Sequence, residues 1–236
     1  MARRGETGSD KLSGVVGAGA ARILEALSRL RRKRIFHPHG VGFEGVLTPL
    51  GERGVGATAL DRESAAIVRL SRSFGLPEWA PDPCGIGLRI PNAYGEGRHQ
   101  DILMVSSARG SVLRHAVLPS RGFSDRPYST LLPYELQGRL IVIGARAAGP
   151  GPGPRLADLR AREQTELEFV LEVASLRDDW RPLATLSLQH RLPPGETERL
   201  CLDPTNTGGG LRLAGFLNRV RGPSYRGSQS GRGIRT

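Results

Sequence analysis

Three segments in the middle of the chain read VRLSRSFG (68–75), DPCGIGLRI (82–90) and QDILMVSS (100–107). They are short, rich in apolar residues and partly bounded by Gly or Pro, which is typical of β-strands joined by turns. Similar segments precede and follow them. We expect strands at 42–47, 57–60, 65–71, 86–90, 101–106, 140–145, 166–173, 183–188 and 199–202. Many short strands and few helical patterns predict an antiparallel barrel or sandwich.

The two ends of the chain differ from this middle part. Residues 1–12 are polar, and we expect them to be disordered. Between Val15 and Arg31 the apolar residues recur at helical spacing, which predicts an N-terminal helix. Residues 13–236 contain no internal repeat and no evident boundary, so we expect one mainly β domain with flanking helices, of the α+β kind.

The charge of the chain restricts its partners. The 236 residues include 34 basic and 23 acidic ones, giving a net charge of +11, and nearly all the basic residues are arginine. Such a charge favours anionic partners: nucleic acid, an anionic membrane surface or a cofactor that carries carboxylates. The arginines are spread along the chain and aromatic residues are few, so we rank nucleic acid last and expect no nucleic-acid partner.

Other features concern the compartment. No apolar run approaches the length of a membrane span, and no apolar segment follows the first residues as in a signal peptide. The two cysteines, Cys84 and Cys201, form no zinc-binding pattern. We therefore expect a cytoplasmic protein without a membrane span. A homo-oligomer remains open, because self-association would cover apolar surface.

Near the C-terminus the chain reads RGPSYRGSQSGR (221–232). On a helix, one face would carry Arg221, Tyr225, Ser228 and Arg232. Positive charge beside a phenol stabilises its ionised form, and a phenolate is a suitable ligand for ferric iron. This spacing resembles the proximal haem-binding signature of catalases. The resemblance implies a C-terminal helix in which Tyr225 is the axial ligand of haem iron and Arg232 keeps it ionised.

The segment RIFHPHGVGFEG (34–45) resembles the distal segment of catalases. His37 falls on the catalytic histidine of that family, and Arg34 falls on an arginine that meets a haem propionate. A histidine there can take a proton from one peroxide oxygen and return it to the other, so that water leaves. The last histidine of the family pattern is Glu44 here.

The three middle segments also follow the order and approximate spacing of catalase motifs. The resemblance makes Arg69 a second propionate partner, and Ser71 a hydroxyl that hydrogen-bonds His37 and fixes its tautomer. It places Ser106 at the position of the distal asparagine, which orients peroxide; a serine hydroxyl is shorter than an amide, which puts efficient dismutation in doubt. The segment LDPTN (202–206) resembles the family's Phe-Asp-Pro-Ser-Asn, so the resemblance covers most of 34–232 at low identity.

The resemblance implies a catalase-like β-barrel that binds haem b and acts on peroxides, as a peroxidase or a weak catalase. Its partners would be a peroxide, organic or lipid hydroperoxides included, and a small-molecule electron donor. Two alternatives stay open. One is a catalase-like barrel that binds haem or a fatty-acid-like ligand without turnover, as the serine at 106 permits. The other is a basic protein associated with nucleic acid.

Overall fold

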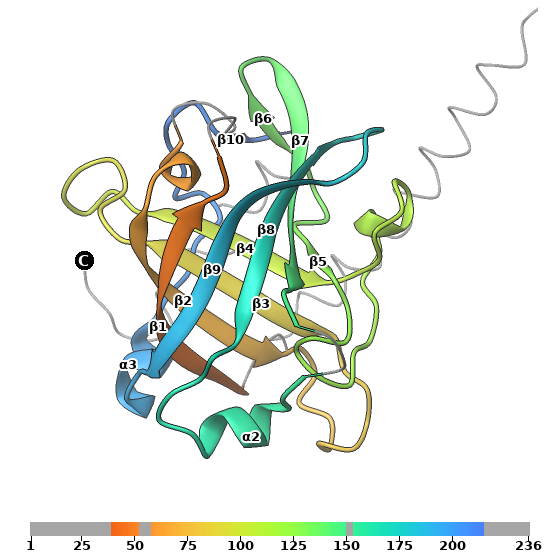
Figure 1. The fold of residues 1–236 in the computed structure, drawn as a ribbon, viewed down its shortest axis with the longest axis vertical. Coiled ribbons are helices and arrows are strands. Elements are labelled where there is room, and N and C mark those ends of the chain that lie inside the picture. Colours follow the sequence, from red (N-terminus) through yellow and green to blue (C-terminus); the bar gives the residue numbers. More distant parts are fainter. Residues whose placement is uncertain (1–38, 52–57, 150–152, 215–236) are drawn as a thin grey trace, which may run out of the picture. The chain divides into compact units, whose positions relative to one another are not determined.

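The computed structural model describes residues 39–51, 58–149 and 153–214, and these residues form a twisted antiparallel sheet (Figure 1). The strands of this part of the chain are β1 (His39–Pro49), β2 (Ser64–Arg72), β3 (Cys84–Ile90), β4 (Gln100–Ser106), β5 (Tyr128–Ser129), β6 (Tyr134–Leu136), β7 (Arg139–Ala147), β8 (Glu168–Ser175), β9 (Arg181–Arg191) and β10 (Arg212–Leu213).

Eight of these strands close into a barrel. Starting from β7, the neighbours run β5, β4, β3, β2, β1, β9 and β8, and β8 pairs with β7 again. Every pairing in the ring is antiparallel, while β6 and β10 extend the sheet beside β7. The prediction of an antiparallel barrel is therefore confirmed. The predicted helices at 15–31 and around Tyr225 lie outside the described residues.

Apolar side chains fill the barrel. Alternate residues of each strand face inwards, so Phe43 of β1, Val68 of β2 and Leu88 of β3 lie in one cross-strand row. All three are fully buried. On the opposite wall, Tyr128 stands edge-on to Phe169, with ring centroids 5.9 Å apart. The core lies inside the ring of strands, so the outward-facing residues are not needed to fill it and can contact other segments or ligands.

Four short helices are described: the 3₁₀ turns η1 (Ala59–Asp61) and η2 (Leu113–His115), and the α-helices α2 (Leu156–Arg160) and α3 (Pro194–Arg199). None of the described helices is long and apolar enough to cross a bilayer.

Two predicted strands are wrong. At 57–60 a capping box forms instead, because Thr58 accepts a hydrogen bond from the Leu60 backbone and Asp61 accepts one from the Thr58 backbone. At 199–202 the chain leaves α3, which starts at a proline pair and ends at Arg199.

Candidate functional site

The outer face of β1–β4 is the part of the barrel where predicted site residues meet. Two cross-strand rows define it. One row contains Gly40, Ser71, Gly85 and Val105, and the next contains Gly42, Arg69, Gly87 and Leu103. These positions alternate with the core residues of the same strands and therefore face away from the barrel interior. Four of these positions are glycines, which have no side chain to cover the backbone. Other groups can therefore approach the backbone of this β1–β4 outer face closely.

The structure places Arg69 and Ser71 together on this face. Ser71 is buried and Arg69 is half-buried. The guanidinium of Arg69 lies over Gly40, where an added Cβ atom would be only 2.6 Å from the Arg69 Cζ. Arg69 therefore extends along the strand towards Gly40, the partner of Ser71 in the β1–β2 ladder. The Arg69 cation and the Ser71 hydroxyl thus lie near the start of β1. In the sequence, β1 begins two residues after His37.

The segment 192–206, which we name the strap, crosses the second row. The Gly42 amide donates to Thr197 Oγ1 at 3.2 Å, and an added Cβ at Gly42 would be 2.7 Å from that oxygen. An added Cβ at Gly87 would be 2.2 Å from Leu202 Cδ1. Both glycines are therefore needed for close contact with the strap. The strap fills the outer face at Gly42 and Gly87, so any planar group on this face would have to lie nearer the row of Gly40 and Ser71.

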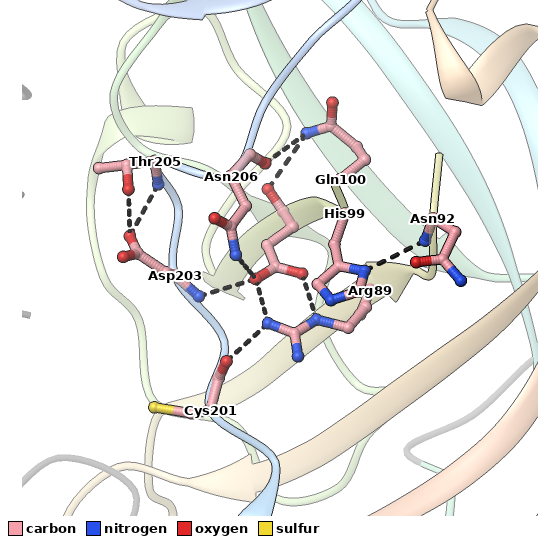
Figure 2. A network of polar contacts seen from close by, with 9 residues as sticks. Arg89, Asn92, His99, Gln100, Cys201, Asp203, Thr205 and Asn206 are labelled. Atoms are coloured by element: carbon pink, nitrogen blue, oxygen red, sulfur yellow. Dashed lines mark hydrogen bonds and ion pairs between the residues drawn. The ribbon is translucent and has the colours of Figure 1, made fainter. Parts of the chain in front are cut away.

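A buried ion pair fastens the strap to β3 and β4 (Figure 2). Arg89 donates two hydrogen bonds to the fully buried carboxylate of Asp101, at 2.7 and 2.6 Å, and a third to the Cys201 carbonyl at 2.6 Å. The Asp203 backbone and the Asn206 amide also donate to Asp101, at 2.8 and 2.9 Å. Burial alone would lower the pKa of Arg89, but the hydrogen bonds and charge of Asp101 outweigh it and raise that pKa.

This network explains the segment LDPTN (202–206), which the sequence analysis associated with catalases without assigning it a contact. Asp203 accepts from the backbone and the hydroxyl of Thr205, which closes a tight turn, and Asn206 reaches Asp101. Asp101 and Arg89 carry no sequence signal of their own, because a charged pair on two strands is ordinarily exposed.

Ser106 does not share the face of Arg69 and Ser71. It is fully buried, and it alternates with Val105 on β4, so it belongs to the inward-facing set with Met104. Its hydroxyl accepts from the Cys84 amide at 3.0 Å and donates to the Leu118 carbonyl at 2.5 Å. These bonds tie the end of β4 to β3 and to the following loop. The residue of β4 that lies on the outer face at this level is the half-buried, apolar Val105.

The other predicted site residues lie outside the described part of the chain. They are Arg34, His37, Arg221, Tyr225, Ser228 and Arg232. Their roles remain predictions.

The described residues fit a haem only in part. Arg69 is an apt partner for a carboxylate. The space over Gly42 and Gly87 is taken by the strap and that over Gly40 by the Arg69 guanidinium, so these three glycines offer no room for a flat group. The axial ligand would come from outside the described ranges. Within those ranges, no cluster of three His, Cys, Asp or Glu side chains could hold a metal ion.

A surface groove of about 640 Å³ lies elsewhere, where the segment 162–166 runs against the end of β9. Its lining is polar and includes Arg162, Glu166 and His190. The groove contains none of the predicted site residues.

Comparisons with known proteins agree with the fold. The structure resembles that of a bacterial catalase with a TM-score of 0.59, over 89% of this chain and 60% of the catalase chain. The fold is catalase-like. The two sequences are 15% identical over the match, so the likeness concerns the fold alone, and this chain spans less than two thirds of that catalase. No protein-family model matches the sequence, and no curated protein matches it.

Proposed function

We propose that the protein is a haem b-dependent oxidoreductase that acts on peroxides. The observation that carries the proposal is the arrangement of Arg69 and Ser71 on one outward face of a catalase-like barrel, next to the start of β1. Their positions agree with the roles that the resemblance gives them: a carboxylate partner and a hydroxyl close to His37. The likeness to a bacterial catalase supports the same class of reaction.

In this proposal the outer face binds and orients the cofactor. Arg69 would pair with a propionate, and Tyr225 would bind the haem iron. Arg34, Arg221, Ser228 and Arg232 complete the cofactor contacts, and Arg232 stabilises the phenolate form of Tyr225. When bound, the haem would supply the two electrons that peroxide reduction requires. A small-molecule donor or a second peroxide returns them.

The proton chemistry belongs to His37 and Ser71. His37 accepts the proton of one peroxide oxygen and delivers it to the other oxygen, so the O–O bond breaks with water as the leaving group. Ser71 holds the imidazole in the tautomer that has its free nitrogen towards the peroxide. Because Ser106 uses its hydroxyl inside the fold, we do not assign it a contact with peroxide.

The absorption spectrum of the full-length protein, produced with a haem precursor present, tests the proposal. We expect a Soret band that Tyr225→Phe removes or strongly weakens. Arg69→Met should lower haem affinity by roughly tenfold, the worth of one charge-assisted hydrogen bond. Arg62→Met, which changes an exposed arginine at the other end of the barrel wall, is the matched control and should leave affinity unchanged. A colourless wild-type protein would contradict the proposal.

Binding without turnover is the second candidate, and the apolar Val105 on the outer face favours it. Steady-state peroxide consumption and peroxidase turnover separate the two. His37→Ala should abolish most turnover in an enzyme, whereas equal rates for wild type and variant would favour the passive binder.

A further inference from the structure

Ser107 directly follows β4, and its hydroxyl is unusual. Its side chain is fully buried, and within the described part of the chain its Oγ has no hydrogen-bond partner. Buried hydroxyls in native proteins are nearly always paired, so an unpaired one needs an explanation. Neighbouring Ser106 is equally buried but has both a donor and an acceptor contact.

The strand ladder shows which way Ser107 faces. Its amide donates to the Pro127 carbonyl at 2.8 Å, one step beyond the Ser106–Tyr128 pair, so the pairing of β4 with β5 continues through Ser107. Successive side chains of a strand face opposite sides. Since Ser106 belongs to the inward set, Ser107 belongs to the outward set, on the side of Val105.

Ser107 therefore adjoins the β1–β4 outer face. The β3–β4 ladder ends at the pair of Gly85 with Val105; beyond it the Leu118 amide donates to the Ser106 carbonyl at 2.8 Å and Asp82 pairs with Ser120, so residues 118–120 run beside this end of β4. Ser107 follows Val105 by two residues and lies on the same side of the chain, so it adjoins the Val105 end of the row of Ser71, Gly85 and Val105. A buried hydroxyl with no partner among the described residues thus lies two residues along the chain from Val105.

We propose that Ser107, rather than Ser106, supplies the hydroxyl that hydrogen-bonds the small polar ligand on this face, which under the proposed function is the peroxide. The inference rests on that function. Val105 supplies an apolar contact beside the ligand. The Ser107 hydroxyl can both donate and accept a hydrogen bond, as a peroxide requires. The ligand would give the Ser107 hydroxyl its hydrogen-bond partner.

Two measurements test this in the full-length protein. The first is thermal unfolding without haem. Ser107→Ala should raise the Tm by a few degrees, because it removes an unpaired buried hydroxyl. Ser106→Ala, the matched control one residue away, should lower it, because it leaves the Cys84 amide and the Leu118 carbonyl unpaired. A lower Tm for Ser107→Ala would mean that its hydroxyl is already used inside the fold, and would overturn the inference.

The second measurement is cyanide binding to the haem-loaded ferric protein, followed by absorption. We expect Ser107→Ala to raise the Kd about tenfold, the loss of one hydrogen bond of ordinary strength. Ser106→Ala should change it less than twofold. An unchanged Kd for Ser107→Ala in a protein with a normal Soret band would overturn this inference and leave the proposed function standing. A wild-type protein that takes up no haem would overturn both.

Discussion

Removing the carboxylate of Asp101 should destabilise the protein more than any other single change in the strap network. The Asp101 side chain is fully buried and accepts from Arg89 at 2.7 and 2.6 Å, from the Asp203 backbone and from the Asn206 amide. Removing one member of a buried ion pair leaves the other charge uncompensated, which costs about 3–5 kcal/mol. Because small domains have roughly 5–15 kcal/mol of stability, Asp101→Ala should lose a large part of the total.

Urea unfolding followed by circular dichroism measures this change. The transition midpoint should fall while its slope stays constant, since the same surface is exposed on unfolding. Asp203→Ala is the matched control: it removes only the turn contacts to Thr205 and should cost about 1 kcal/mol. The double variant Arg89→Met with Asp101→Ala should recover part of the loss, because it removes the unpaired cation. If Asp101→Ala were no less stable than Asp203→Ala, the anchoring role of the ion pair would be refuted.

Three further predictions concern the same barrel. Gly87→Ala should cost about 1–3 kcal/mol in urea unfolding, because the new methyl group meets Leu202, whereas Gly110→Ala, where the added Cβ meets nothing within 4 Å, should be nearly neutral. Adding Leu202→Ala to Gly87→Ala should relieve the clash between the two side chains. If the stability losses of the two single variants simply added up in the double variant, the close contact of Gly87 with Leu202 would be contradicted. Burial raises the pKa of Cys84 to about 12, well above its value in an unfolded chain, so the folded thiol keeps its proton where the unfolded one loses it. The contribution of Cys84 to the free energy of unfolding should therefore be largest below about pH 9. Between pH 9 and pH 12 it should fall by about 1.4 kcal/mol per pH unit. In Cys84→Ala this decrease of the free energy of unfolding with pH should be absent. If the pH dependence were the same as in the wild type, the raised pKa of Cys84 would be contradicted. Arg114 lies over the Trp180 ring at 4.8 Å and donates to the Ser175 and Asp178 carbonyls, so Arg114→Ala should lower the Tm by several degrees, whereas exposed Arg177→Ala should not.

The long strands could be predicted from the sequence because apolar runs bounded by turn residues are a local signal. β2 and β4 lie within one residue of their predicted limits at both ends. The short strands β5 and β6 could not be predicted, because two or three residues are too few to show a strand pattern and become strands only through pairing with β7. The helix α3 was missed for a related reason: its six residues have too short a pattern to stand out.

The faces of β4 were harder to predict than the strand itself. Leu103 and Met104 are both apolar, and Val105 is followed by two serines, so no alternation of polar and apolar residues indicates which side is inward. The physical reason is that the strap covers the outside of β3 and β4, so both faces are shielded from water. Ser106 could therefore be taken for the outward residue from sequence alone, and only the register with Tyr128 shows that it faces the core.

The closure of the barrel has a consequence for synthesis on the ribosome. β1 is the first described strand to emerge, and one of its two partners, β9, ends only at Arg191. Until then the growing sheet carries two open edges whose backbone groups can pair with another nascent chain. Chaperone demand should therefore peak late in translation, and fragments that stop before residue 181 should aggregate even though they contain most of the wall.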